Sequence, residues 1–148
     1  MVGKRLQSLG YSGHNYPGVG EAAAIRLNLS QAVVVPAGKQ VWVTGQIGWK
    51  DNFEIVTSSL EEQYMQAFEN VALSLAAAGS SWEHVFKVES FHTETEHGLM
   101  GPDFAEALEK CVDKYLGDTR PAWTAIGVQK CTDARIKMEI QVWAAVPE

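Results

Sequence analysis

Residues Arg135–Val146 have the sequence R-I-K-M-E-I-Q-V-W-A-A-V. Their side chains alternate in character with a period of two, which is the period of a β-strand. The apolar series that faces one way consists of Ile136, Met138, Ile140, Val142 and Ala144. The opposite series consists of Arg135, Lys137, Glu139, Gln141 and Trp143. The pattern predicts a strand that packs one face against helices.

Two amphipathic helices are expected upstream, and they would cover that apolar face. Ser59 can cap the first helix, and Glu62 three residues later completes a capping box. Apolar residues then recur at helical spacing until Gly79, where a helix is expected to stop. The second helix is expected over Asp103–Leu116 and ends at Gly117.

The remaining apolar segments predict further strands. Ile25–Leu29 alternates and leads into the β-branched run Ala32–Val35. Pro36–Lys39 has the Pro and Gly of a turn, so the run should form a hairpin with Gln40–Ile47. The other strands expected are Arg5–Leu9, Val85–Thr93 and Trp123–Val128. Together these elements predict one α+β domain over residues 1–148, in which two helices cover one face of a mixed β-sheet.

Composition and charge limit the class of partner. Of the 148 residues, 46% are apolar and 20% are charged, which is ordinary for a globular protein. The net charge of −6 disfavours binding to phosphate backbones and anionic lipid. Cys111 and Cys131 form no disulfide framework, and no apolar run has the length of a membrane span. We therefore expect a cytoplasmic protein with no nucleic-acid and no membrane partner.

The far face of the sheet is expected to carry aromatic side chains. Trp42 or Val43, Trp123 or its neighbours, and Trp143 fall on strands whose other face is needed for the core. A sheet face with exposed aromatics and no covering helices usually has a partner, and self-association is the simplest one.

Two sequence patterns suggest chemistry but have simpler interpretations. Gly18–Ala23 matches G-x-G-x-x-A, yet the strand alternation expected after it favours a loop over a dinucleotide site. His92, Glu94, Glu96 and His97 are residues of metal-binding type, but their spacing fits no familiar site, so a solvated loop is preferred.

Glu139 is the candidate with two open interpretations. It can be a surface carboxylate that pairs with Lys137. Alternatively a partner subunit covers it, and the carboxylate then handles a proton or a water molecule. The residues alone favour the first interpretation.

Six segments in order resemble the Rid (YjgF-like) family, also known as L-PSP endoribonucleases. They are Leu29–Val35, Val41–Gly48, Glu61–Val71, Ala76–Val88, Arg120–Ala122 and Lys137–Ile140, which include the motifs V-W-V-T-G-Q-I-G, R-P-A and K-M-E-I. The resemblance implies a chorismate-mutase-like fold, a homotrimer whose sheets form an inner barrel, and a small-molecule cleft between subunits. It also implies hydrolysis of 2-imino or enamine acids to 2-keto acids and ammonia, without a metal or organic cofactor.

The resemblance carries over to the site residue by residue. Thr44, with Gly45 after it, keeps the hydroxyl that lines the family cleft, and Glu139 keeps the carboxylate that holds the attacking water. Leu29 stands where a Tyr is usual, and Trp123 stands where an Arg grips the substrate carboxylate. An indole lacks the two-pronged charged clamp of a guanidinium.

Arg120 is the substitute clamp that the sequence offers, although strand alternation does not direct it to the position of Trp123.

Three candidate functions follow from the resemblance: an enzyme with an altered substrate, a trimeric binding or regulatory module without catalysis, and a ribonuclease. The acidic charge argues against the third.

Overall fold

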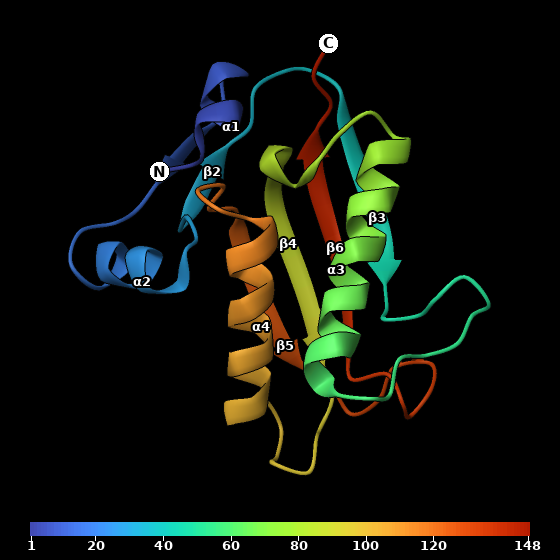
Figure 1. Ribbon diagram of the computed structural model, residues 1–148. Coiled ribbons are helices and arrows are strands. Elements are labelled where there is room, and N and C mark those ends of the chain that lie inside the picture. Colours follow the sequence, from blue (N-terminus) through green and yellow to red (C-terminus); the bar gives the residue numbers. More distant parts are fainter.

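The computed structural model describes residues 1–148 as four α-helices, one short 3-10 helix and six strands (Figure 1). The N-terminal elements are α1 (Lys4–Ser8), β1 (Ser12–His14), α2 (Val19–Leu27) and β2 (Ala32–Val34). The remaining elements are β3 (Gln40–Gln46), α3 (Leu60–Ala77), η1 (Trp82–His84), β4 (Val85–His92), α4 (Pro102–Tyr115), β5 (Ala122–Gly127) and β6 (Met138–Ala145).

The main sheet has four strands in the order β3-β6-β4-β5. The pairs β3–β6 and β4–β6 are antiparallel, whereas β4 and β5 run parallel. Figure 1 shows α3 and α4 side by side across this sheet. The mixed sheet of an α+β fold with two helices on one face is therefore present, as the sequence predicted.

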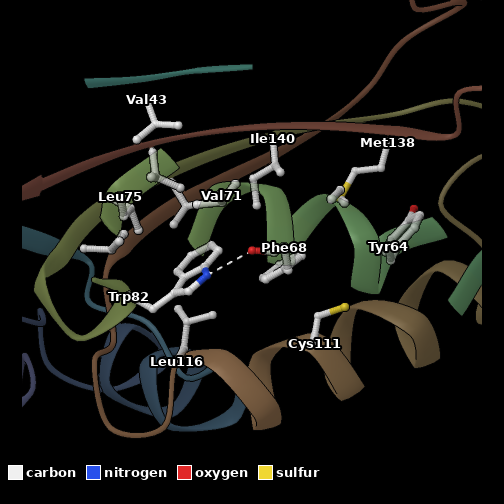
Figure 2. Close-up of a cluster of buried hydrophobic side chains, with 14 of the residues drawn as sticks. Val43, Tyr64, Phe68, Val71, Leu75, Trp82, Cys111, Leu116, Met138 and Ile140 are labelled. Carbon is white, nitrogen blue, oxygen red and sulfur yellow. Dashed lines mark hydrogen bonds between the residues drawn. The ribbon is translucent and has the colours of Figure 1, made fainter. Parts of the chain in front are cut away.

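The alternation along β6 is confirmed. Met138, Ile140 and Val142 are each at most 1% exposed, while the intervening Glu139 and Gln141 are half-buried. Figure 2 shows the apolar side chains of the sheet pointing toward α3, with side chains of α4 on the helix's other side. The core consists of Val43, Tyr64, Ala67, Phe68, Val71, Leu75, Trp82, Val85, Val88, Ala107, Cys111, Leu116, Met138, Ile140, Val142 and Ala144.

The ends of α3 follow local sequence signals. The Ser59 hydroxyl accepts the backbone N–H of Glu62 at 3.1 Å, as predicted for the cap. The other half of the capping box is absent, because the Glu62 carboxylate accepts a hydrogen bond from the Ser58 hydroxyl instead. Gly79 follows the helix with a φ of +79°, a left-handed conformation that favours glycine.

The N-terminal predictions were wrong in three respects. Arg5–Leu9 lies mostly in α1, and Ile25–Leu29 begins within α2, so neither is a strand. The alanine run that precedes Ile25 has high helix propensity, and Asn28 ends α2 in a left-handed conformation with a φ of +52°. The expected hairpin is also absent, since β2 pairs with β1 in a separate two-stranded sheet rather than with β3.

The N-terminal segment has its own packing contacts with the main sheet. Val2, Leu6 and Tyr11 form a second apolar cluster with Phe86 and Ala145. Tyr11 and Phe86 have ring centroids 5.1 Å apart. This cluster holds the segment that precedes α2 against the main sheet. None of the helices is long and apolar enough to cross a membrane.

Candidate functional site

Trp123 lies on the helix-covered side of the sheet. In the parallel pairing of β4 and β5 it stands opposite Val88, which is fully buried in the core. Its ring centroid is 6.5 Å from that of Phe68 on α3. The sequence placed Trp123 or its neighbours on the far face with Trp143. For Trp123 itself this is wrong, because the register with β4 turns it toward the core. Trp42 and Trp143 do pair on the far face, with ring centroids 6.2 Å apart.

A buried hydrogen-bonded chain starts at the Trp123 indole. Its Nε1–H donates to Ser90 Oγ at 3.0 Å, and Ser90 Oγ lies 2.8 Å from His92 Nε2. His92 Nδ1 in turn lies 2.8 Å from the Tyr64 hydroxyl. Ser90 and His92 are 0% exposed and Tyr64 is 1% exposed. Trp123 thus has no N–H left to offer a ligand and presents only the apolar surface of its ring.

His92 is uncharged at neutral pH. Burial lowers the pKa of His92 to about 4, and the Phe104 ring packs edge-on against the imidazole with 4.4 Å between centroids. The neutral imidazole has one donor and one acceptor nitrogen, which matches the two hydroxyl groups beside it. The hydrogen-bonded chain from Trp123 to Tyr64 therefore contains no buried charge.

A cleft of about 620 Å³ opens beside Trp123, between the end of α2, α4 and β5. Eight of its twelve lining residues are apolar, which makes it suited to an apolar or aromatic ligand. The apolar lining consists of Leu27, Leu29, Phe104, Ala105, Leu108, Val112, Trp123 and Ala125. The polar lining consists of Arg26, Asn28, Glu109 and Asp113.

The backbone around Leu29 is fixed to the start of β5. The N–H of Ser30 donates to the carbonyl of Pro121 at 3.0 Å, and its hydroxyl donates to the carbonyl of Arg120 at 2.7 Å. These two bonds bring Leu29 and Trp123 to one cleft, although 94 positions separate them in the sequence numbering.

Arg120 lies outside the lining of the cleft. Its Nε donates to the Asn28 side-chain oxygen at 3.2 Å. It adopts a left-handed backbone with a φ of +48°, just before Pro121. The cationic side chain that does line the cleft is that of Arg26, on α2.

The second group of predicted site residues lies on the far face. Glu139 stands opposite Phe91 in the β4–β6 register and is half-buried. A Cβ at Gly45 would lie 2.8 Å from the Glu139 carboxylate oxygen Oε1, so only glycine leaves room for this carboxylate. Thr44 is exposed at the neighbouring position of β3.

The simple pairing of Glu139 with Lys137 is not observed. The Lys137 ammonium donates to the carbonyl of Glu94 at 3.1 Å, and Glu139 makes no ion pair with any side chain of this chain. Its carboxylate is therefore free of the partner that the surface interpretation assigned to it.

The predicted residues thus form two groups on opposite sides of the sheet. Leu29 and Trp123 lie together in the cleft, while Thr44, Gly45 and Glu139 lie together on the far face. Sequence reasoning missed Ser90, Tyr64 and Phe104, and it considered His92 only as a metal ligand. The alternation of S-F-H in β4 placed Ser90 and His92 on the core side, and that was the available signal.

The structure also places the residues of the two sequence motifs. His92 is buried, whereas His97 is exposed and lies 3.5 Å from Glu96, so the four metal-type residues do not converge. The loop expected over Gly18–Ala23 is wrong, because Gly18 caps α2, which begins at Val19. The β1–β2 pairing is antiparallel, however, whereas a dinucleotide fold needs parallel strands.

A family model described as endoribonuclease L-PSP matches residues 21–146. The chain belongs to this family. The family match includes both groups of site residues, and residues 1–20 precede it.

Relatives of the family support the same assignment. The RutC family protein YjgH of Escherichia coli is 30% identical over 117 residues, which is 79% of this chain and 83% of YjgH. The mitochondrial protein mmf2 of Schizosaccharomyces pombe is 33% identical over 75% of this chain and 83% of its own. The solved structure of yeast Mmf1 is 29% identical, with a TM-score of 0.60 over 80% of this chain and 86% of Mmf1.

The fold likeness extends over most of the chain. The Rid family protein YyfB from Yersinia pestis superimposes with a TM-score of 0.78 over 91% of this chain and 98% of YyfB, at 22% identity. Membership of the L-PSP family therefore rests on sequence, and the architecture of nearly the whole chain has a solved counterpart.

Proposed function

We propose that this chain is a Rid-type small-molecule protein whose cleft binds an uncharged, apolar or aromatic ligand in place of a 2-imino acid. The proposal rests on the position and hydrogen bonding of Trp123. Its indole lines the cleft, and its only donor group is already bonded to Ser90 at 3.0 Å. A ligand carboxylate would find no partner there, and an unpaired carboxylate in such a site is costly.

The charges around the cleft support the same preference. Two carboxylates, Glu109 and Asp113, line it together with one guanidinium, Arg26. Arg26 forms no ion pair within the chain, and it lies on the α2 side. The surplus of one negative charge disfavours an anionic ligand further.

We assign the catalytic step to Glu139 in a homotrimer of chorismate-mutase-like subunits. In that assembly the far face of one subunit would lie against the cleft of the next, so that Thr44 and Glu139 meet Leu29 and Trp123. The carboxylate accepts a proton from water while the oxygen adds to the imine carbon. The carboxylic acid then returns this proton to the nitrogen. Collapse of the carbinolamine passes its hydroxyl proton to the nitrogen as the C–N bond breaks, which releases ammonia or an amine, leaves a carbonyl group and needs no cofactor.

A matched pair of probes tests the proposal. Benzamide and benzoate have nearly the same shape and differ in charge, so their affinities compare an uncharged with an anionic ligand directly. We expect benzamide to shift the amide signals of residues around Trp123 in NMR titrations. The affinity for benzoate, taken from the same signals, should be at least tenfold lower, because its carboxylate lacks one charged hydrogen-bonding partner. Preferential binding of benzoate would refute the proposal.

A non-catalytic binding module is the second candidate. The observation that favours it is the position of Glu139, which faces away from the cleft within one chain. Steady-state turnover of an uncharged imine separates the two candidates, because a binding module gives none. A ribonuclease is the least favoured function, since the net charge of −6 opposes binding to RNA.

A further inference from the structure

We propose that Ser90, His92 and Tyr64 are positioning residues that hold the Trp123 indole in one orientation and thereby determine which ligands the cleft accepts. The inference rests on the proposed function in one respect, that Trp123 is a wall of the ligand cleft. None of the three residues lines the cleft, so each acts through Trp123.

The chain of contacts connects three elements of the fold. Tyr64 is on α3, Ser90 and His92 are on β4, and Trp123 is on β5. The three successive donor–acceptor distances are 2.8 Å, 2.8 Å and 3.0 Å, all of ordinary hydrogen-bond length. A rotation of the Trp123 ring would break the last of these bonds.

Burial makes that rotation unfavourable. Ser90 and His92 are fully buried, so no water replaces the indole as a partner of the Ser90 hydroxyl. The Phe104 ring stacks edge-on against His92 and also lines the cleft, which holds the imidazole from the ligand side. The indole is therefore fixed with its ring surface, rather than its N–H, toward the cleft.

A purely structural role for the three residues makes a different prediction. Loss of a buried hydrogen bond would then lower stability without altering the cleft. Ser80 provides the matched control, because it is also a buried serine and its hydroxyl donates to the carbonyl of Ala145 at 2.7 Å. Ser80→Ala and Ser90→Ala each remove one buried hydroxyl, but only Ser90 contacts Trp123.

The test records the indole N–H signals of the protein by NMR and assigns that of Trp123 with Trp123→Phe. In Ser90→Ala we expect the Trp123 signal to shift and its hydrogen exchange to accelerate. We also expect benzamide to bind about tenfold more weakly, because the variant lacks the hydrogen bond that holds the Trp123 indole in place at the cleft. In Ser80→Ala both readouts should match the wild type.

Tyr64→Phe is the second variant, since it removes one hydroxyl at the end of the chain and keeps the ring. It should accelerate exchange of the Trp123 N–H to a smaller degree. An unchanged Trp123 signal in Ser90→Ala, or equal benzamide affinities in Ser90→Ala and Ser80→Ala, would overturn the inference. If the wild type binds no benzamide, the proposed function fails, and the indole signal still decides whether the three residues position Trp123.

Discussion

Gly45 lies directly against the carboxylate of Glu139. A Cβ at position 45 would stand 2.8 Å from both the carboxyl carbon and Oε1 of Glu139. Because the obstructing atoms belong to the end of a flexible side chain, an added methyl group would displace the carboxylate rather than the backbone. The position of Glu139 therefore depends on glycine in the neighbouring strand.

Gly45→Ala should displace the Glu139 carboxylate while leaving the stability of the fold nearly unchanged. We expect the free energy of unfolding to change by less than about 1 kcal/mol, as for most substitutions without a buried clash. Turnover of an uncharged imine such as N-methylbenzaldimine, followed by release of benzaldehyde, should fall as far as in Glu139→Gln. The double variant should be no worse than either single variant, since both remove the same contribution. Full turnover in Gly45→Ala would exclude Glu139 from the reaction.

The family resemblance, together with the exposed far face of the sheet, predicts a trimer in solution. Trp42 is 73% exposed in the single chain and pairs with Trp143, and large exposed aromatics of this kind usually have a partner. Light scattering should give three times the chain mass of 16.2 kDa at micromolar concentration. Trp42→Lys should shift the mass toward that of one chain, because an ammonium group is unfavourable in a buried interface. A wild-type mass of one chain would contradict the trimer.

His92 should make stability depend on pH in a defined window. The unfolded imidazole takes up a proton near pH 6.5, while burial lowers the pKa in the folded protein to about 4. Between these values the unfolded state binds more protons, so the free energy of unfolding falls as the pH falls from about 6.5 to 4. The total loss is on the order of 3 kcal/mol and levels off below pH 4.

His92→Asn is the variant that isolates this effect. Urea unfolding at several pH values should show a smaller decline for the variant, because contributions from other titrating groups are common to both proteins. His84, whose pKa is also lowered by burial, is one of these shared groups. Parallel curves for the two proteins would show that His92 is not buried as a neutral group.

Most of the main sheet and its two helices could be predicted from the sequence because their signals are local. The alternation of Met138 to Trp143 specifies two faces, and the cap at Ser59 and the left-handed Gly79 specify the ends of α3. The N-terminal predictions failed because I-R-L-N-L has alternation compatible with a strand, while the preceding alanines favour a helix. Periodicity over five residues was too short to decide between them.

The site was harder to predict because it depends on pairing between distant segments. Only the register of β4 with β5 places Trp123 opposite Val88 and over Ser90. The contact of Gly45 with Glu139 likewise depends on the irregular pairing of β3 with β6 between Val43 and Gln46. The residue types alone identified the candidate site residues. Their separation onto two sides of the sheet became visible only in the structure.

Whether Trp123 excludes ligand carboxylates can be decided by steady-state hydrolysis of a 2-imino acid by the wild type and by Trp123→Arg. An amino-acid oxidase can supply the imino acid, and ammonia or the 2-keto acid can be followed. We expect little or no acceleration by the wild type, because Trp123 offers the carboxylate no donor. Trp123→Arg should increase the rate, and Glu139→Gln in that background should abolish the gain. Rapid hydrolysis of the 2-imino acid by the wild type, with no gain in Trp123→Arg, would show that Trp123 does not exclude carboxylate ligands.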